Sequence, residues 1–387
     1  MKRIPSIDVA RGLVMVIMAL DHVRELMHVT SQTQSPTDLS TTTGALFMTR
    51  WITHLCAPTF VFLSGTSAYL SLKNSGDVSA NQRFLRSRGL WLIFLEITVV
   101  NFALWFDLSF RTIIFQVIAA IGAGFLVLSF LLKAPARTVG LLGVAIIVCH
   151  NLVQGVTFTD TIPLRVIWSL FFRPDVFPVT PQFMVGLLYP WVPWLGIMLA
   201  GYGAGLLFER PDNSRRRTLL LAGLGSLAVF VVVRLINSYG DPAPWSAQAT
   251  PGFTLLSFIN TTKYPPSLLY TTMTLGITIT VMALVDGIQN RFTEALSVYG
   301  RVPMFYYLIH WYLIHSLMLV MLFLQGFTPD QFVFGPFQFG RPKETSGVDL
   351  PATYLIWLGL VVFLYFPCRW YWQYKRRHKQ IWWLRYI

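Results

Sequence analysis

Six ionisable side chains lie inside apolar stretches that are long enough to cross a membrane: Asp21, His22, Arg24, His54, His310 and His315. Placing such a group at the centre of a bilayer costs about 2.5–3.5 kcal/mol, so it persists where it lines a polar cavity or pairs with another charge. Histidine exchanges protons near neutral pH, which suits a general base, a proton relay or an acyl carrier. These residues therefore predict a reaction centre or a transport path inside a helical bundle.

The composition is that of a membrane protein. Of the 387 residues, 54% are hydrophobic and 12% are charged, whereas soluble domains carry about 25% charged residues. The net charge of +13 is compatible with nucleic-acid binding, but the positive residues gather at alternate ends of apolar segments, so no nucleic-acid partner is expected. Cys56, Cys149 and Cys368 form no CxxC pair, so neither a disulfide framework nor a zinc site is predicted.

Ten apolar segments have about the 20 residues that a membrane span needs. They lie at 6–27, 46–72, 87–107, 111–132, 138–156, 185–208, 216–236, 267–287, 302–325 and 351–372. Most of the 30 Lys and Arg residues fall on one side of these spans, which predicts that both termini are cytoplasmic. We expect an all-α polytopic membrane bundle of about ten transmembrane helices in one domain, residues 1–372, followed by a basic and aromatic cytoplasmic tail, 373–387. Four longer outer segments, 28–45, 157–184, 237–266 and 326–350, could form a vestibule.

The first segment carries two polar clusters. Arg11 lies near the inner interface, where it either anchors the helix or forms one wall of an entrance for an anionic ligand. At ~1.5 Å per residue, His22 lies about 16 Å deeper. There Asp21 and Arg24 can neutralise each other, and Glu25 can orient the imidazole of His22. The alternative is a self-satisfied polar patch on a buried helix face.

The second segment places Arg50 and His54 one helical turn apart, on the same face. Pro58 cannot donate a main-chain hydrogen bond, so we expect a kink near the middle of the membrane. Ser64 and Gly65 are small enough to let another helix or a ligand approach closely. Helix packing and a buried hydrogen bond of His54 are the alternatives to a functional role.

The ninth segment and the loop before the eighth complete the set of candidate residues. Tyr306 and His310 share a helix face, whereas His310 and His315 are five residues apart and do not form a metal-binding pair. No metal site is expected. Lys263 and Tyr264 precede two prolines that predict a rigid start to the eighth helix; Lys263 either faces a cavity or extends towards the interface.

The chain resembles the heparan-alpha-glucosaminide N-acetyltransferase family and its bacterial relatives, within a broader transmembrane acyltransferase superfamily. The motifs that carry the resemblance are Ser6-Ile-Asp8 with Arg11-Gly12, Asp21-His22, Pro58 through Gly65, Lys263 through Ser267, and Gly300-Arg301-Val-Pro303 with His310. The resemblance implies an enzyme of the plasma (bacterial inner) membrane that takes an acetyl group from cytoplasmic acetyl-CoA. It implies an acceptor on the far side, an amino sugar in the animal lysosomal enzymes and here a sugar or cell-envelope glycan. The resemblance also implies a functional histidine after the first span, as in the animal enzymes; near that place this chain has His28 and His54, whereas His22 lies earlier, within the span.

These considerations give a set of expected roles. The expected catalytic residues are Asp21, His22, His54 and His310, with His22 as base. Acetyl-CoA is expected at Arg11, Arg24, Arg50, Ser64 and Arg301, with Arg86, Arg88 and Arg137 as further cations at the inner face. The acceptor is expected at Lys263, Tyr264 and Tyr306. The bilayer is the remaining partner, and a homodimer is one option for the oligomeric state.

Two other functions suit part of this pattern. A proton-coupled transporter of a small solute would use the same buried Asp, His and Arg as a proton relay. A membrane sensor without enzymatic activity is the third interpretation. The sequence contains no GxxxxGK[ST], no GxGxxG after a strand and no GxSxG. Nucleotide hydrolysis, dinucleotide chemistry and α/β-hydrolase chemistry are therefore not expected.

Overall fold

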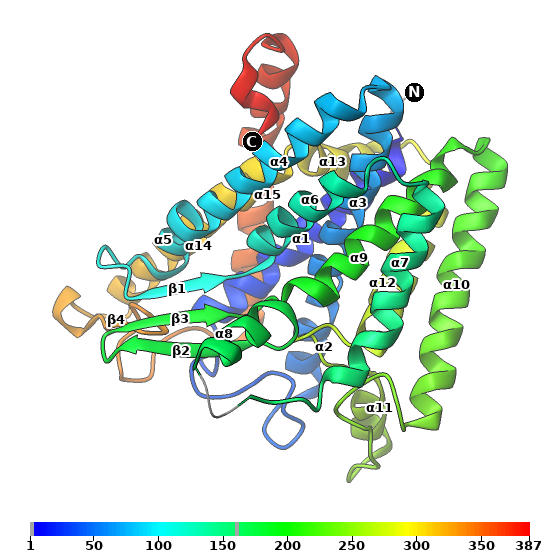
Figure 1. Ribbon diagram of the computed structural model, residues 1–387. Helices are drawn as coiled ribbons and strands as arrows, with labels where there is room; N and C mark the ends of the chain where they lie inside the picture. Colours follow the sequence, from blue (N-terminus) through cyan, green and yellow to red (C-terminus); the bar gives the residue numbers. More distant parts are fainter. Residues whose placement is uncertain (1–3, 159–161) are drawn as a thin grey trace.

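A computed structural model describes residues 4–158 and 162–387. The helices run between two ends of a bundle, and both chain termini lie at the same end (Figure 1). Helices in the described residues account for the ten predicted spans. They are α1 (Pro5–Met27), α2 (Gly44–Thr53) with α3 (Cys56–Ser75), α4 (Val78–Leu95) with the π-helical turn η1 (Glu96–Val100) and α5 (Asn101–Trp105), α6 (Val117–Leu131), α7 (Ala136–Cys149) with η2 (His150–Val153), α9 (Trp191–Ala204) with η3 (Gly205–Glu209), α10 (Asp212–Ile236), α12 (Leu268–Val285), α14 (Pro303–Leu324) and α15 (Leu350–Arg377).

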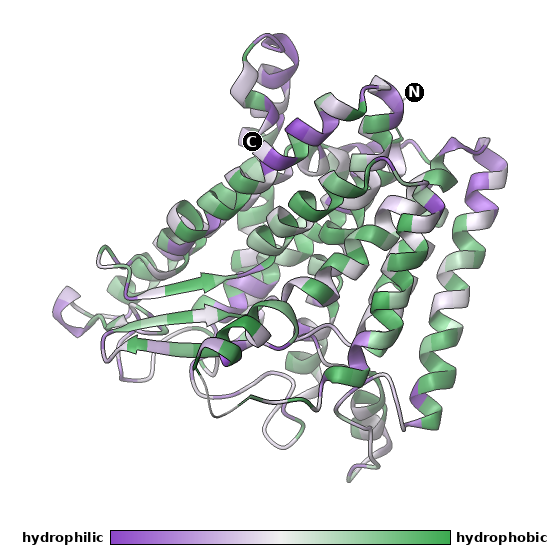
Figure 2. Cartoon of the chain, in the orientation of Figure 1, coloured by the Kyte–Doolittle hydropathy of each residue, from purple (hydrophilic) through white to green (hydrophobic). Residues whose placement is uncertain are grey.

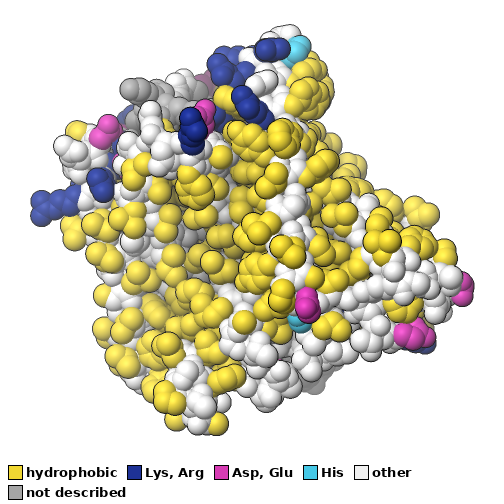
Figure 3. All heavy atoms as spheres, turned by 180° about the vertical axis from the view of Figure 1, so that it is seen from behind, with side chains coloured by type: hydrophobic (Ala, Val, Ile, Leu, Met, Phe, Trp, Pro, Cys, Tyr) yellow, Lys and Arg dark blue, Asp and Glu magenta, His cyan; other side chains and the backbone are white. Residues whose placement is uncertain are grey.

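The surface of the bundle is that of a membrane protein. Eight of the described helices are long and apolar enough to cross a membrane. Hydrophobic residues line the middle of the helices and hydrophilic residues gather at their ends (Figure 2). From behind, Lys and Arg side chains cluster at the end that holds the termini, next to a broad apolar surface (Figure 3). The all-α polytopic membrane fold is therefore confirmed. We call the end with the termini the basic end; the positive-inside rule predicts that it faces the cytoplasm.

The remaining elements cap the two ends of the bundle. The amphipathic helix α13 lies at the basic end and α11 at the opposite end (Figure 1). A three-stranded sheet of order β1-β3-β2 pairs β1 with β3 in parallel and β2 with β3 antiparallel. These shorter elements are α8 (Ile162–Phe171), α11 (Pro251–Ile259), α13 (Arg291–Arg301), η4 (Pro329–Gln331), η5 (Trp382–Arg385), β1 (Thr112–Phe115), β2 (Asp175–Thr180), β3 (Phe183–Leu187), β4 (Phe334–Gly335) and β5 (Gln338–Phe339).

The sheet corrects two of the predicted span boundaries. Residues 112–115 form β1 rather than the start of the fourth span, and residues 185–187 belong to β3 rather than to the start of the sixth span. A short apolar run fits a buried strand as well as a helix, and periodicity alone does not separate them. Helices α6 and α9 consequently begin at Val117 and Trp191.

Helix α1 occupies the centre of the bundle, and most of its residues are buried. It packs against α13 at main-chain distance. A Cβ atom added to Gly12 would lie 1.8 Å from the carbonyl oxygen of Leu296, and one added to Gly300 would lie 1.9 Å from that of Asp8. Glycine is therefore required at both positions, and the contact fixes the start of α1 relative to the end of α13.

The second span is broken, but one turn earlier than its proline. Helix α2 ends at Thr53 and α3 begins at Cys56, so Pro58 lies in the first turn of α3. Proline cannot donate to the carbonyl four residues before it, which is that of His54. The hydroxyl of Tyr270 on α12 donates to this carbonyl oxygen over 2.8 Å. The predicted kink therefore exists, and its effect appears at His54.

Candidate functional site

Two adjoining compartments form a cavity at the basic end. The outer compartment has a volume of about 300 Å³ and the deeper one about 90 Å³. They share Arg11, Ser64 and Arg88 among their lining residues. The cations that line the outer compartment are Arg11, Arg88, Arg301, Lys375 and Arg385. We call the two compartments together the basic-end cavity.

Arg11 is held in place at the mouth of this cavity. Its guanidinium donates to the hydroxyl of Ser67 over 2.9 Å and to the carbonyl oxygen of Gly300 over 3.3 Å. The carboxylate of Asp8 lies 3.8 Å from Arg11 and 3.9 Å from Arg301. One carboxylate therefore orients two guanidinium groups at the rim, and the close contact of α1 with α13 makes this spacing possible.

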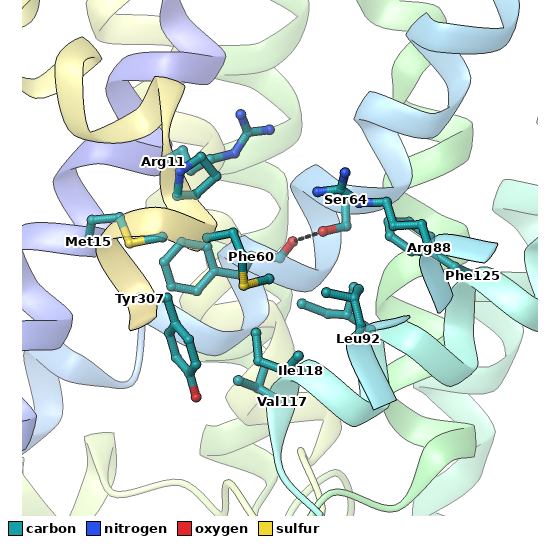
Figure 4. Close-up of a pocket in the computed structure, with 13 residues that line it drawn as sticks. Arg11, Met15, Phe60, Ser64, Arg88, Leu92, Val117, Ile118, Phe125 and Tyr307 are labelled. Carbon is teal, nitrogen blue, oxygen red and sulfur yellow. Dashed lines mark hydrogen bonds between the residues drawn. The ribbon is translucent and has the colours of Figure 1, made fainter. Parts of the chain in front are cut away.

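The deeper compartment is mainly apolar, and its walls come from α1, α3, α4, α6 and α14 (Figure 4). Met15, Leu92 and Ile118 line it, together with the ring of Tyr307. Ser64 contributes a hydroxyl, which donates to the main-chain oxygen of Phe60 over 2.8 Å. A charged mouth that leads into an apolar channel suits a ligand with an anionic head and a slender, weakly polar arm.

A second cavity, of about 530 Å³, opens at the opposite end; we call it the opposite-end cavity. Its walls come from α1, α2 and the loop segments 31–37 and 260–264, so two of the four predicted vestibule segments contribute. Residues 159–161 of a third segment lie outside the described residues. The charged and aromatic side chains that line it are Arg24, Glu25, Arg50, His54, Lys263 and Tyr264.

Two of the three cations that line the opposite-end cavity are paired with a buried carboxylate. Arg24 donates to Asp21 over 3.0 Å, and Arg50 on α2 makes a short contact with the other oxygen of the same carboxylate. Asp21 is 6% exposed, so these two arginines supply the compensation that a buried carboxylate needs. Arg24 and Arg50, which we expected at acetyl-CoA together with Arg11, thus line a different cavity from Arg11, Ser64 and Arg301.

Histidine and aromatic rings lie between the levels of the two cavities. The ring centroid of His22 is 3.8 Å from that of Trp311 and 5.3 Å from that of His310. The ring of Tyr306 lies 5.3 Å from that of His310. Glu25 has a carboxylate oxygen 3.5 Å from Nδ1 of His22. We call His22, Trp311, His310 and Tyr306 the ring layer.

The ring layer contains polar atoms that are free to react. Nδ1 of His310 lies 3.0 Å from the carbonyl oxygen of Tyr306. Because a carbonyl only accepts, Nδ1 carries the proton and Nε2 keeps its lone pair. Within the described residues, Nε2 of His310 and the hydroxyl of Tyr306 are buried without a hydrogen-bond partner. Buried groups of this kind are costly unless something else satisfies them, which makes this layer the candidate reaction centre.

His315 and His54 lie outside the ring layer. His315 lies between the carbonyl oxygens of Ala103 (3.2 Å) and Phe339 (3.0 Å) and stacks on Phe106 at 3.8 Å. It therefore links α5, α14 and β5 and lies away from both cavities. His54 lines the opposite-end cavity one turn after Arg50.

Comparison with known proteins agrees with this architecture. Residues 3–235, more than half of the chain, match the family described as heparan-alpha-glucosaminide N-acetyltransferase, catalytic. The chain belongs to this family. No curated protein matches the chain. The protein is thus a multi-pass member of a family of membrane acetyltransferases.

The match to the N-acetyltransferase family covers part of each cavity. It includes Arg11, His22, Arg50, Ser64 and Arg88, and it ends within α10. The remaining site residues come from the rest of the chain: Lys263, Tyr264, Arg301, Tyr306, His310, Lys375 and Arg385. Both halves of the chain therefore build each cavity of this family member.

Sequence reasoning missed several residues of the site. Lys375 and Arg385 were assigned to a separate tail, yet both line the basic-end cavity. Trp311 follows His310 directly, and its proximity to His22 depends on how α14 packs against α1. Across residues 4–158 and 162–387, no group of three or more His, Cys, Asp and Glu side chains is arranged to hold a metal ion.

Proposed function

We propose that the protein transfers the acetyl group of acetyl-CoA, bound at the basic end, to a sugar or cell-envelope glycan at the opposite end. The observation that carries the proposal is the placement of a histidine-containing ring layer between two cavities of different chemistry. Membership in an acetyltransferase family favours this reaction over the transport of a solute. By the positive-inside rule, the donor is cytoplasmic and the acceptor lies on the outer side of the plasma or bacterial inner membrane.

The basic-end cavity suits the donor. Arg88 and Lys375 supply positive charge for the pyrophosphate and the 3′-phosphate of CoA, beside Arg11 and Arg301 at the rim. The deeper compartment would take the pantetheine arm, whose end is directed towards Tyr307. His310 lies one helical turn beyond Tyr307, so the thioester would approach the ring layer from this side.

The opposite-end cavity suits a hydroxylated or amino sugar. Lys263 and Tyr264 on one loop and His54 after α2 offer hydrogen-bonding groups from two different segments. We assign Arg24 and Arg50 to this acceptor side, where their contacts with Asp21 shape the wall of the cavity.

In the proposed reaction, the acceptor nitrogen or oxygen attacks the carbonyl carbon of the thioester. The new bond to carbon forms as the carbon–sulfur bond breaks, and His22 takes the proton that the acceptor loses. Glu25 orients His22, and the proton finally reaches the sulfur of CoA, which leaves as a thiol. The Tyr306 hydroxyl is placed to stabilise the oxyanion, and His310 or His54 assists. A route through an acetyl-histidine would break the same carbon–sulfur bond in a separate first step.

Binding of the donor tests the proposal directly. The protein, purified in detergent, is heated with acetyl-CoA, with CoA or with ADP as a nucleotide that lacks the pantetheine arm. A ligand at 100 times its Kd stabilises a protein by about 2.7 kcal/mol, so the CoA species should raise Tm clearly more than ADP does. Release of free CoA thiol with an amino-sugar acceptor then tests the transfer. If no CoA species changes Tm, the proposed function is wrong.

A further inference from the structure

The carboxyl-terminal segment lies across the mouth of the basic-end cavity. Helix α15 ends at Arg377, and His378 closes it by stacking on Tyr374 at 4.1 Å. The main chain then turns back, with Ile381 donating to the carbonyl oxygen of His378 over 3.1 Å. We call residues 378–387 the strap. Arg385 and Ile387 of the strap line the outer compartment of the cavity.

The strap is fastened to α4 by side chains. Leu384 is 2% exposed and is part of the hydrophobic core. Tyr386 shares a hydrogen bond of 2.9 Å with Ser87 and packs against the ring of Phe84 at 5.9 Å. By contrast, Trp382 and Trp383, in the same short turn, are 68% and 42% exposed. Leu384 and Tyr386 therefore hold the strap, together with Ile381 and Ile387, which are partly buried against the core.

The strap also accepts hydrogen bonds from two of the cations that line the cavity. Arg88 donates to the main-chain oxygen of Arg385 over 2.5 Å, and Lys375 donates to that of Ile387 over 2.5 Å. Within the described residues, Arg88 has no Asp or Glu carboxylate within 4.0 Å. Arg88, a cation at the mouth, is thus bonded to the neutral carbonyl oxygen of Arg385. Hydrogen bonds to an ionised phosphate are about twice as strong as those to a neutral acceptor, so an incoming anion would replace this carbonyl.

We propose that the strap is a lid of the basic-end cavity and that Arg385 is a donor-binding residue that the lid carries. The donor enters after the strap leaves α4, because the strap bonds the cations that the donor needs. When the strap closes again, Leu384 returns to its pocket and Arg385 contacts the phosphates from the open side. The proposal rests on the proposed function for the nature of the ligand, but the movement of the strap does not.

A labelling experiment tests the lid without any ligand. Ser67 lines the outer compartment, and Ser67→Cys in a Cys149→Ser background places a thiol there, since Cys56 and Cys368 are buried. A charged thiol reagent should reach this thiol about tenfold faster in Leu384→Ala, because truncating a buried leucine removes more free energy than a factor of ten requires. The exposed Trp383→Ala is the matched control and should leave the rate unchanged. Equal rates in all three proteins would overturn the lid.

The kinetics of acetyl-CoA binding test whether the lid controls entry of the donor and whether Arg385 binds it. Leu384→Ala should raise both the association and the dissociation rate constants, since a lid limits both directions. Faster dissociation with unchanged association would mean that the segment is a fixed wall, and this would overturn the proposal. Arg385→Gln should weaken acetyl-CoA binding about tenfold, whereas the exposed Lys379→Gln should not; equal effects would remove Arg385 from the site. If the unaltered protein binds no acetyl-CoA, the proposed function fails while the labelling still decides the lid.

Discussion

The two cavities are both lined by cations, yet the cations have different partners. At the opposite end, Arg24 and Arg50 are bonded to the buried carboxylate of Asp21. At the basic end, Arg88 and Lys375 are bonded to main-chain oxygens of the strap. Arg24 and Arg50 compensate a buried carboxylate, whereas Arg88 meets a neutral carbonyl oxygen and keeps its charge for a ligand. Arg11 and Arg301 are intermediate, because they share the carboxylate of Asp8 at 3.8 and 3.9 Å.

The two cavities also differ in the kind of secondary structure that forms their walls. The deeper compartment of the basic-end cavity is enclosed by the helices α1, α3, α4, α6 and α14, and the strap lines the outer compartment. The opposite-end cavity is walled partly by the loop segments 31–37 and 260–264. Helices hold a fixed shape more firmly than loops do, and loops vary more easily. The wall that varies more easily is therefore the one on the proposed acceptor side.

Removing the base between the cavities should have the largest effect. We expect His22→Ala to lower the rate of acetyl transfer by about 10²–10⁴-fold, which is the usual contribution of general acid–base catalysis. Stabilisation by acetyl-CoA should remain, because His22 lines neither cavity. Glu25→Gln should lower the rate less, since it removes only the orienting carboxylate. Full transfer activity of His22→Ala in a CoA-release assay would refute the role of His22.

Asp21→Asn should produce the next largest effect, and it should act on stability. It leaves the guanidinium groups of Arg24 and Arg50 without their carboxylate, and breaking a buried pair in this way costs about 3–5 kcal/mol. The melting temperature in detergent should fall by several degrees. Asp330→Asn, at an exposed position, is the control. An unchanged melting temperature would show that the two cavities do not differ as described.

Arg88→Gln should have a moderate effect that is confined to the donor. Hydrogen bonds to charged groups contribute about 1.5–3 kcal/mol, so the KM for acetyl-CoA should rise about tenfold or more. The melting temperature should change little, in contrast to Asp21→Asn. Arg86→Gln is the matched control, because Arg86 lies on the same helix but contacts Ser129 and Phe130. Equal KM values for the two variants would contradict a donor site at Arg88.

The smallest expected effect is a pH dependence at the opposite end. Nδ1 of His28 accepts hydrogen bonds from the nitrogen (3.3 Å) and hydroxyl (3.1 Å) of Thr30. Burial, followed by the charges of Arg24 and Arg341, lowers the pKa of His28 below its ordinary value of 6.5, and Asp349 opposes this shift. The unfolded chain therefore takes up the proton first as the pH falls. The stability that neutral His28 provides is present above pH 6.5 and is lost as the pH falls towards the folded pKa.

Thermal unfolding checks this pH dependence. Between about pH 7.5 and pH 5, the range in which histidine titrates, the unaltered protein should lose more of its melting temperature than His28→Asn does. Asparagine can accept the bonds from Thr30 and does not titrate. Identical losses in the two proteins would mean that protonation of His28 does not matter to folding.

The helical bundle was predictable because long apolar runs bounded by charges have few other solutions in a membrane. The errors arose where this signal is short. Ile113, Ile114 and Phe115 continue an apolar run, yet they pair with β3 as a strand. Pro58 marked a break correctly, but the position of the break depends on the carbonyl that proline leaves without a donor, and Tyr270 supplies that donor from a distant helix.

The candidate site was predictable as far as local spacing reaches. Asp21 with Arg24, and His22 with Glu25, are three residues apart and meet on one helix, as expected. The contact of Arg50 with Asp21 requires α2 to pack on α1, so the division of the arginines between two cavities could not be read from the sequence. The charges of the tail already fitted the positive-inside pattern, so they did not indicate that the tail lines a cavity. No local signal indicated that the strap folds back over the basic-end cavity.

The ring layer has an electrical consequence. In the proposed reaction, a neutral acetyl group leaves the basic end, while the proton of the acceptor must reach the sulfur that stays behind. One elementary charge thus moves towards the cytoplasm for each acetyl group that moves outwards. Moving one elementary charge across the whole membrane changes its free energy by about 2.3 kcal/mol per 100 mV of membrane potential. In a membrane that is negative inside, the voltage itself would drive acetylation forwards, and His22, Trp311, His310 and Tyr306 would lie within the field that does so.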